Sequence, residues 1–566
     1  MRYQLLLLIC LLIAGEAGAQ NSISFIESLN HPNPWADSVF HKLSRKQRIA
    51  QLFFVRAHTD KGKAYEDSIA RVILKEKIGG LVFFQGGPVR QAQLTQQYQH
   101  LAKVPLLIAM DGEWGLGMRL DSCISYPYQM TLGAIQDNHL IELMGQHIAF
   151  DFKKIGAHIN FAPDADVNNN PKNPVIGFRS FGDDKYKVAQ KAAAYMRGMQ
   201  QENLLVSLKH FPGHGDTDVD SHYDLPQLKF SRERLDSLEL YPFKELIKQG
   251  ASGVMVAHMQ IPALDNTPNL PSTLSKPIVT ELLKEQLGFK GLVFSDAMGM
   301  KGVVKFFPNG EADVRAIIAG NDVLELSENS KRAVKLIRKA IRNKRISWGQ
   351  INSSVKKVLA AKYWAGLNKP IMIETDQLIS TLNQPESVQL NQQLADAAVT
   401  VLNGQSGIKS LNKDKKTLIL SIGQEVISPF QQNLKAYFSN AELQNLGKQA
   451  TQAALDAIQQ QLRNYEQIIV GIHDTRKRPA PVLDFSLELG AFISQLAHNK
   501  AIINVFANPY TLIQLPGMEK TETLLMNYQN SEEMQKAAAK VIAGIIPSKG
   551  KLPVNINSYF RNGDGL

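Results

Sequence analysis

Short apolar runs alternate with longer amphipathic stretches along the first two thirds of the chain. This alternation is typical of βα units built around a parallel sheet. The runs that we predict as strands are residues 51–57, 79–87, 105–113, 158–166, 204–211, 253–259, 291–300 and 321–326. Eight such units fit one closed barrel, so the pattern predicts an α/β fold that begins with a (β/α)8 TIM-like barrel.

A second set of apolar runs follows the barrel pattern. Residues 332–367 keep a helical period, and the polar stretch 368–383 is predicted as a linker. Helical patterns such as 452–465 then separate the apolar runs at 417–423, 467–473, 501–507 and 523–528. We therefore predict a barrel domain with its lead-in over 20–367 and a smaller α/β sandwich domain over 384–566.

The first residues carry the pattern of an export signal. An early Arg2 precedes an apolar run from Leu5 to Ala14, and a small-x-small pattern ends at Ala19, after which cleavage is predicted. The run is too short for a permanent membrane anchor. Residues 1–19 are thus predicted as a signal peptide, and the mature protein as periplasmic or extracellular. Cys123 would then be its sole cysteine, which excludes an internal disulfide.

Composition and charge are those of an ordinary globular protein. Hydrophobic residues make up 44% of the chain and charged residues 20%, and 63 Lys and Arg against 52 Asp and Glu leave a formal charge of +11. The basic residues form no run that is interleaved with aromatic residues. This pattern favours solvated basic faces over nucleic-acid binding, although a mild attraction for anionic polymers is compatible with it.

Polar side chains stand at or just after the carboxyl ends of the predicted barrel strands. In a parallel barrel these ends meet at one mouth, where enzymes of this architecture carry their chemistry. Polar residues scattered over the surface would have no reason to recur at the same position relative to successive strands. The residues that share this position are Asp111, Asp164, Lys209, His210, His258 and Asp296.

The stretch 209–222, "KHFPGHGDTDVDSH", concentrates three histidines and three aspartates. Its proline and two glycines exclude a continuous helix, so His210 and His214 are not an i, i+4 pair on one helical face. Three interpretations stay open from the residues alone: a metal site, sugar or acyl chemistry, and structural histidines. The chain has no His-x-His pair, which weighs against a metal.

Two further groups supply the parts of a proton-transfer reaction. In an extended loop Asp220 and His222 turn to the same side, where the carboxylate orients the imidazole and raises its basicity. Asp296 follows the predicted strand "GLVFS" and has the position of a nucleophile that attacks an anomeric carbon. A helix N-cap aspartate is the ordinary alternative for such a residue.

Several motifs together resemble a known family. They are "GGLVFFQGG", "AMDGEWGLGMRL", "NFAPDADV", "NPVIGFRSFGDD", "KHFPGHGDTDVDSH" and "GLVFSDAMGM". Their order and spacing resemble glycoside hydrolase family 3, in its bacterial β-N-acetylglucosaminidase branch. The resemblance runs from about Leu43 to Leu367 and continues more weakly through the second domain. The "DSH" motif favours this branch because the β-glucosidases of the family lack it.

The resemblance implies roles for individual residues. Asp296 would be the nucleophile, His222 the general acid/base and Asp220 its dyad partner. It implies neither a metal nor a cofactor. The residues at positions that bind hydroxyls of the non-reducing sugar are Asp111, Arg179, Lys209 and His210.

The function expected from these motifs is that of a retaining exo-β-N-acetylglucosaminidase. It would release GlcNAc from peptidoglycan fragments or chitooligosaccharides through a covalent glycosyl-Asp intermediate, with no essential catalytic group from the second domain. Trp114, where many relatives have Gly, would reshape the aglycone side. The rival hypotheses are a β-N-acetylglucosaminide phosphorylase and a catalytically inactive glycan-binding protein. The carbohydrate is the expected partner, and the oligomeric state stays open.

Overall fold

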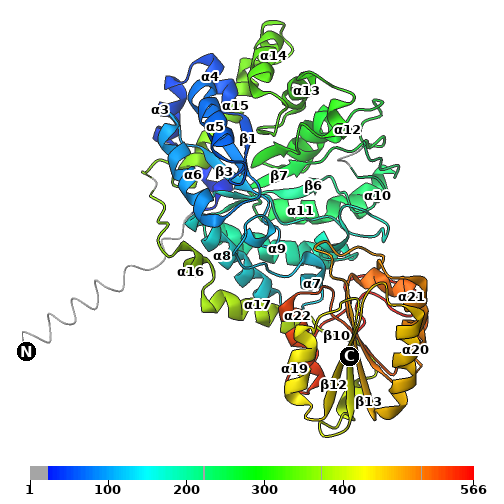
Figure 1. The fold of residues 1–566 in the computed structure, drawn as a ribbon. Coiled ribbons are helices and arrows are strands. Elements are labelled where there is room, and N and C mark those ends of the chain that lie inside the picture. The colour runs from blue at the N-terminus through cyan, green and yellow to red at the C-terminus, as the bar shows by residue number, and fades with distance from the viewer. Residues whose placement is uncertain (1–22, 221–223, 371, 499) are drawn as a thin grey trace, which may run out of the picture.

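The computed structural model describes residues 23–220, 224–370, 372–498 and 500–566, which form two domains. In Figure 1 the first domain, coloured blue to green, lies above the second, coloured yellow to red. None of the helices in these ranges is long and apolar enough to cross a membrane. The predicted signal peptide falls outside the described residues.

The first domain is a barrel of parallel strands. Its strands are β1 (Phe53–Ala57), β2 (Gly80–Phe83), β3 (Leu107–Met110), β4 (Ile159–Asn160), β5 (Leu205–Val206), β6 (Leu208–Phe211), β7 (Gly253–Val256), β8 (Leu292–Ser295) and β9 (Leu324–Glu325). Two parallel sheets run in the orders β5-β4-β3-β2-β1-β9 and β6-β7-β8. A bridge between Phe294 and Val323 joins the second sheet to the segment that enters β9. Each predicted run contains one strand position, β5 and β6 sharing one run, so the TIM-like barrel is confirmed.

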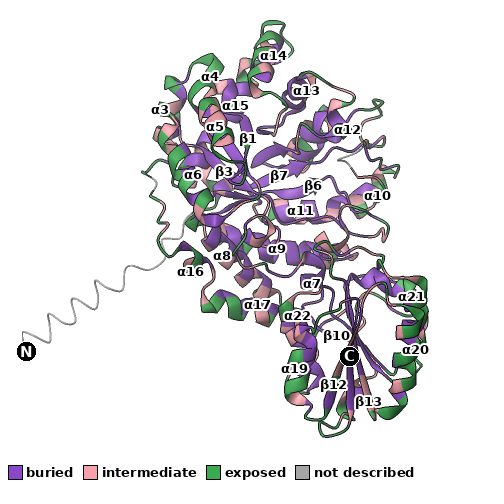
Figure 2. Ribbon diagram, viewed as in Figure 1, coloured by how far each residue is buried: buried purple, intermediate pink, exposed green. Residues whose placement is uncertain are grey.

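Helices connect the strands and cover the outside of the barrel (Figure 1). They are α5 (Lys63–Glu76), α6 (Pro88–Leu101), α8 (Asn138–Lys154), α9 (Lys185–Gln201), α11 (Leu240–Lys248), the π-helical η4 (Pro277–Gln286), α13 (Glu311–Ala319) and α14 (Ser330–Arg342). Apart from Val55 and Arg56 in β1, the strand residues are buried, whereas the helices expose their outer faces (Figure 2). Double-sided burial explains why the strands read as continuous apolar runs rather than alternating ones.

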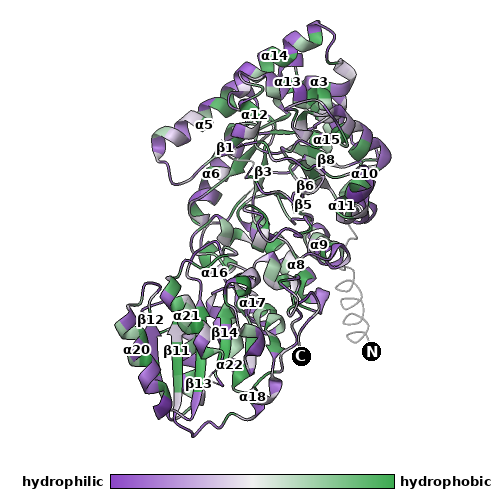
Figure 3. Ribbon diagram, turned by 90° about the vertical axis from the view of Figure 1, so that its right-hand side faces the viewer, coloured by the Kyte–Doolittle hydropathy of each residue, from purple (hydrophilic) through white to green (hydrophobic). Residues whose placement is uncertain are grey.

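The second domain is an open sheet between two layers of helices. Its strands are β10 (Thr400–Asn403), β11 (Thr417–Ile422), β12 (Ala441–Leu446), β13 (Gln467–His473), β14 (Ile502–Phe506) and β15 (Thr523–Met526). The order is β10-β15-β14-β13-β11-β12, with β10 antiparallel to β15 and the other pairs parallel. The hydrophobic strands stand between more polar helical surfaces (Figure 3). The α/β sandwich prediction is confirmed.

The apolar pattern did not predict β10 and β12, the two edge strands of this sheet. The predicted runs became β11, β13, β14 and β15, whereas β10 and β12 carried no clear signal. The middle residues of β12, Glu442–Asn445, are exposed or half-buried. An edge strand needs less apolar character because one side of it faces solvent, so the apolar pattern is weak there.

The two domains are joined by buried polar contacts and by the last residues of the chain. The hydroxyl of Tyr510 donates to the carbonyl of Asn168 over 3.1 Å, and the amide of Tyr128 donates to Gln529 over 2.8 Å. Asp183 in the barrel domain accepts from the backbone and side-chain nitrogens of Asn555 over 2.6 and 2.7 Å. These contacts fix the second domain beside the mouth of the barrel. Within the predicted linker lies a short helix, α16 (Leu378–Leu382).

Candidate active site

A cavity of about 720 Å³ opens at the carboxyl ends of the barrel strands. Six of the seven residues predicted for the site lie in its wall: Asp111, Arg179, Lys209, His210, Asp220 and Asp296. The seventh, His222, lies outside the described residues. The tertiary structure thus brings together groups that are up to 185 positions apart in the sequence (296 − 111). Their catalytic roles stay predictions.

Lys209, in β6, is the central cation of the site and is only 2% exposed. Its Nζ lies 2.7 Å from Glu113 Oε1, 3.0 Å from Asp111 Oδ1 and 3.8 Å from Asp164 Oδ1. Burial opposes the charged ammonium, but the three carboxylates outweigh it and raise the Lys209 pKa. Arg119 binds the other oxygen of Asp111 at 2.6 Å. Asp111 and Lys209 therefore both stay ionised at the cavity wall.

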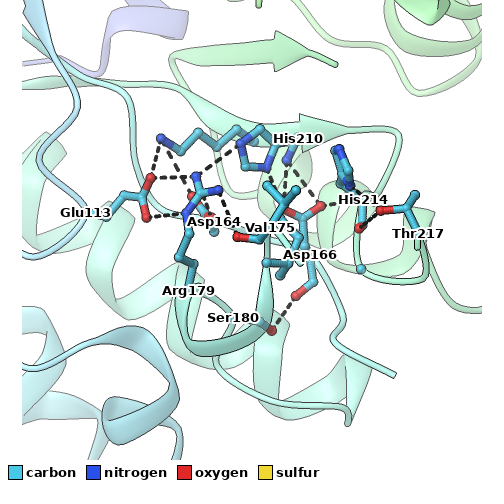
Figure 4. Close-up of polar contacts among 12 residues, drawn as sticks. Glu113, Asp164, Asp166, Val175, Arg179, Ser180, His210, His214 and Thr217 are labelled. Carbon is cyan, nitrogen blue, oxygen red and sulfur yellow. Dashed lines mark hydrogen bonds and ion pairs between the residues drawn. The ribbon is translucent and has the colours of Figure 1, made fainter. Parts of the chain in front are cut away.

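Arg179 is shared unequally between two carboxylates (Figure 4). Its Nε and Nη2 donate to Glu113 over 2.9 and 2.7 Å, whereas Nη2 lies 3.3 Å from Asp164. Burial would raise the pKa of both acids, but Arg179 and Lys209 lower that of Glu113 to about 2. Asp164, whose side-chain oxygens accept no hydrogen bond from another described residue, keeps a raised pKa because burial dominates. Glu113 is the anion that holds both cations in place.

Asp166 organises the start of the histidine-rich loop (Figure 4). Its Oδ2 accepts from the Nδ1 of His210 over 2.7 Å, and its Oδ1 accepts from the amide of His214 over 2.6 Å. Burial would lower the pKa of His210, but Asp166 and Asp164 outweigh it and raise that pKa. Burial and the neighbouring His210 lower the pKa of His214 to about 4. One histidine therefore favours the charged form and the other stays neutral.

Asp296 stands on a turn that is tied to the barrel. Its amide donates to the carbonyl of Val256 over 3.0 Å, and its own Oδ1 accepts from the amide of Ala297 over 2.7 Å. His258, a predicted mouth residue, contacts the Ala297 carbonyl through Nε2 at 3.1 Å and Thr273 Oγ1 through Nδ1 at 2.7 Å. His258 thus supports the turn that presents Asp296 to the cavity.

The metal interpretation of the loop can be compared with the geometry. Among the described residues, one trio of groups could place ligand atoms around a common point: Asp164, Asp166 and His210. Asp166 already accepts from a ring nitrogen and two backbone amides, and Asp164 faces Arg179 and Lys209. A divalent cation there would lie against two fixed positive charges. The arrangement favours hydroxyl binding over metal binding.

Prolonged treatment with EDTA is therefore expected to leave hydrolytic activity unchanged. The positive charge that a metal would supply at this trio comes from Arg179 and Lys209 instead. The measurement is the initial rate after dialysis against EDTA, with a mock-dialysed sample as control. Loss of activity that added Zn²⁺ restores would contradict this interpretation of the loop.

The second domain also contributes to the cavity wall, which the sequence did not predict. Its contributing residues are Arg478, Pro479, Ala480, Pro481, Val482 and Asn508. The hydroxyl of Tyr128, in the barrel domain, donates to the carbonyl of Lys477 over 2.7 Å and holds this loop in place. Tyr128 also packs against Trp114 and Phe178, with ring centroids 4.8 Å apart in both pairs. Trp114 and Phe178 line the same cavity.

The sequence patterns did not predict four residues that line the cavity or form hydrogen bonds to its wall. Glu113 and Asp166 each stand two positions after a carboxylate that the analysis had noted, and residues two apart in extended chain face the same side. Glu325 is a charged residue between Leu324 and Leu326 in the predicted strand run 321–326, which is itself a signal of function. Arg478 had no local signal because its place depends on how the domains pack.

Comparisons with known proteins agree with this architecture. The model of the glycosyl hydrolase family 3 N-terminal domain matches residues 44–361. The chain is 27% identical over 550 residues to β-hexosaminidase A of Pseudoalteromonas piscicida, covering 86% of this chain and 91% of the relative. It is 32% identical over 270 residues to a β-hexosaminidase of Nitrosomonas eutropha, covering 46% of this chain and 76% of the relative.

A solved structure extends the likeness to both domains. The family 3 β-N-acetylglucosaminidase from Paenibacillus sp. str. FPU-7 superposes with a TM-score of 0.77 at 31% identity. The match covers 91% of this chain and 99% of that one. The family model spans more than half of the present chain, and it ends within the last helix of the barrel domain, α15 (Trp348–Trp364). The chain therefore belongs to glycoside hydrolase family 3 and is a glycoside hydrolase.

Proposed function

We propose that the protein is a retaining exo-β-N-acetylglucosaminidase. The observation that carries the proposal is the set of fixed charges around Asp296: an ionised Lys209, an ionised Asp111 and an Arg179 held by Glu113, all facing one cavity. Charged groups in fixed positions form directional hydrogen bonds to vicinal hydroxyls and orient a sugar ring for attack. The names of the relatives support β-N-acetylhexosaminides as the substrate class.

The reaction would proceed in two steps. His222 donates a proton to the leaving oxygen while Asp296 attacks the anomeric carbon, which forms a glycosyl-enzyme. His222 then takes a proton from water, and this water releases the sugar from Asp296 with retention of configuration. Asp220 would stabilise the imidazolium form of His222 in the step where that form exists.

The rim of the cavity favours an anionic aglycone. Arg56, Lys172 and Arg478 lie on the rim with exposed side chains, and none has an ion-pair partner within the described part of the chain. Arg476 fixes the loop that presents Arg478, because it binds both carboxylate oxygens of Asp474 at 2.7 Å and the carbonyl of Val482 at 2.6 Å.

These unpaired cations distinguish the two substrate classes. Peptidoglycan fragments carry carboxylates on the muramic acid side of the scissile bond, whereas chitooligosaccharides are neutral. A guanidinium on a rigid loop forms charge-assisted bonds to a carboxylate with little loss of side-chain entropy. We therefore favour peptidoglycan fragments, and we further propose export, on the pattern of residues 2–19, to a compartment where such substrates occur.

The proposed function is tested by comparing chromogenic aryl glycosides. The protein should hydrolyse the aryl β-N-acetylglucosaminide with a higher kcat/KM than the aryl β-glucoside, and NMR should show that the β-anomer of GlcNAc forms first. The products should be the same in phosphate and in phosphate-free buffer. A sugar 1-phosphate as the main product would favour the phosphorylase, and tight binding without turnover would favour the glycan-binding protein.

Arg478→Gln is expected to change aglycone selection without changing the chemistry. It should lower kcat/KM about tenfold on a disaccharide with a carboxylate-bearing aglycone, because one charge-assisted hydrogen bond is lost. The neutral chitobiose and the aryl glycoside should be hydrolysed at nearly the wild-type rate. Arg463→Gln is the matched control, since Arg463 is an exposed arginine of the same domain outside the cavity wall. Equal losses on neutral and anionic substrates would contradict this role.

A further inference from the structure

Glu325 is a buried carboxyl in the wall of the same cavity and takes no part in the proposed reaction steps. It is the last residue of β9, which pairs with β1 on one side. On the other side the bridge from Val323, directly before β9, leads to Phe294 in β8. Glu325 is 3% exposed. The side chain lines the cavity together with Asp111 and Asp296. Its buried Oε1 has no hydrogen-bond partner among the described residues. A buried polar atom without a partner costs free energy, so folding alone gives no reason for this side chain.

The backbone around Glu325 is tied to both sides of the Asp296 turn. The amide of Glu325 donates to Ser295 Oγ over 3.0 Å, and its carbonyl accepts from the amide of Met298 over 2.9 Å. The next residue, Leu326, has a φ of +52°, a left-handed conformation that is strained for a branched side chain. The backbone that carries the Glu325 side chain is therefore fixed beside the Asp296 turn by hydrogen bonds and maintained against strain.

The charge state of Glu325 follows from its surroundings. Burial raises its pKa well above the ordinary range, and the nearby carboxylates of Asp111 and Asp296 add to this effect, while Lys209 opposes it. The raised pKa favours the protonated carboxylic acid, the form that has a proton to donate. A neutral acid in such a pocket can donate a hydrogen bond where a carboxylate could only accept one.

We propose that Glu325 is a further sugar-binding residue, whose carboxylic acid donates a hydrogen bond to a hydroxyl of the bound N-acetylhexosamine beside Asp296. The proposal rests on the proposed function for the identity of the sugar. The cations and anions of the cavity wall that are described above are already paired with one another, so a neutral Glu325 adds a donor without adding a charge. The hydroxyl would contact the part of the carboxyl group that lines the cavity.

Two substitutions separate hydrogen bonding from shape. Glu325→Gln keeps the length and a donor group, and its kcat/KM on the aryl β-N-acetylglucosaminide should stay within about threefold of the wild type. Glu325→Met keeps the length but has no donor, and its kcat/KM should fall about 10- to 100-fold. Glu328→Gln, at an exposed glutamate three positions along, is the control and should behave as the wild type.

Stability distinguishes a binding role from a structural one. Removal of an unpaired buried polar group is neutral or stabilising, so Glu325→Met should unfold at the same denaturant concentration as the wild type or at a higher one. If Glu325→Met does not fold, Glu325→Ala takes its place in the same measurements. A marked loss of stability with unchanged kcat/KM in the folded fraction would overturn the proposal.

Deoxygenated substrates identify the contact. Aryl glycosides that lack the 3-, 4- or 6-hydroxyl are compared in the wild type and in Glu325→Met. One deoxygenation should slow the wild type strongly and the variant very little, because the partner of that hydroxyl is already gone. Equal penalties for all three substrates in both proteins would overturn the proposal, as would an equal loss in Glu325→Gln and Glu325→Met. If the wild type instead prefers β-glucosides, the proposed function fails, and the same comparison with deoxy-glucosides still tests Glu325.

Discussion

Asp296→Ala is expected to lower kcat by about 10³- to 10⁵-fold, or about 4 to 7 kcal/mol, while the fold survives. A nucleophile forms a bond that no neighbouring group can replace. The Asp296 side chain is half-buried at the cavity, and the turn that carries it is held by backbone bonds to Val256 and through His258, so its loss should not disturb the barrel. The measurements are kcat on an aryl β-N-acetylglucosaminide and the circular dichroism spectrum of the variant.

A trapping experiment tests whether Asp296 forms the covalent intermediate. A slow 2-fluoro or 5-fluoro glycosyl donor without an acetamide should leave an adduct on Asp296, found by mass spectrometry of the peptide around "VFSDAMGM". In the competing mechanism the acetamido oxygen of the substrate attacks, and an enzyme carboxylate only polarises it. Absence of an adduct, together with an absolute requirement for the 2-acetamido group, would show that mechanism instead.

His222→Ala is expected to affect substrates according to their leaving groups. A poor leaving group needs protonation in the first step, so kcat/KM on a disaccharide should fall about 10²- to 10⁴-fold. An activated aryl glycoside leaves without a proton, and its first step should be slowed far less. The measurement is kcat/KM on a series of aryl glycosides with leaving groups of rising pKa.

Asp220→Asn provides the matched comparison for His222. The carboxylate of Asp220 is predicted to orient and charge the imidazole rather than to transfer the proton, so its loss should be smaller but should follow the same leaving-group trend. Equal losses of His222→Ala on all leaving groups would mean that His222 is not the acid. The proton donor would then have to be sought among the other groups at the cavity.

The repeating order of the first domain was readable from the sequence. Double-sided burial makes each barrel strand a nearly continuous apolar run, and helical segments separate most of these runs. This pattern depends only on residues that are close together in the sequence, so it can be recognised without knowing any tertiary contact. Strand β12 was missed because the edge of a sheet does not demand an apolar run, and β10 is a run of only four residues.

Much of the candidate site was also predictable, for a topological reason. Asp111 and Asp296 directly follow their strands, Lys209 lies within β6, and a parallel barrel brings the carboxyl ends of all strands to one mouth. The position of a residue along its strand was therefore enough to predict that its side chain lies at the mouth of the barrel. The loop that carries Asp220 and His222 was identified by its residues, and the structure describes Asp220 in the cavity wall but not His222.

What only the tertiary structure decided is how these groups are paired and what closes the cavity. The sequence could not tell that Glu113 binds both Lys209 and Arg179, because each of these contacts joins segments that meet only when the barrel closes. Arg478 reaches the rim only because the second domain packs beside the mouth. In the sequence Glu325 is one of several polar residues in the predicted strand run 321–326, and its burial near Asp111 and Asp296 depends on β9 closing the ring. Local patterns determine the elements and their order, whereas burial and charge depend on distances that exist only in the folded chain.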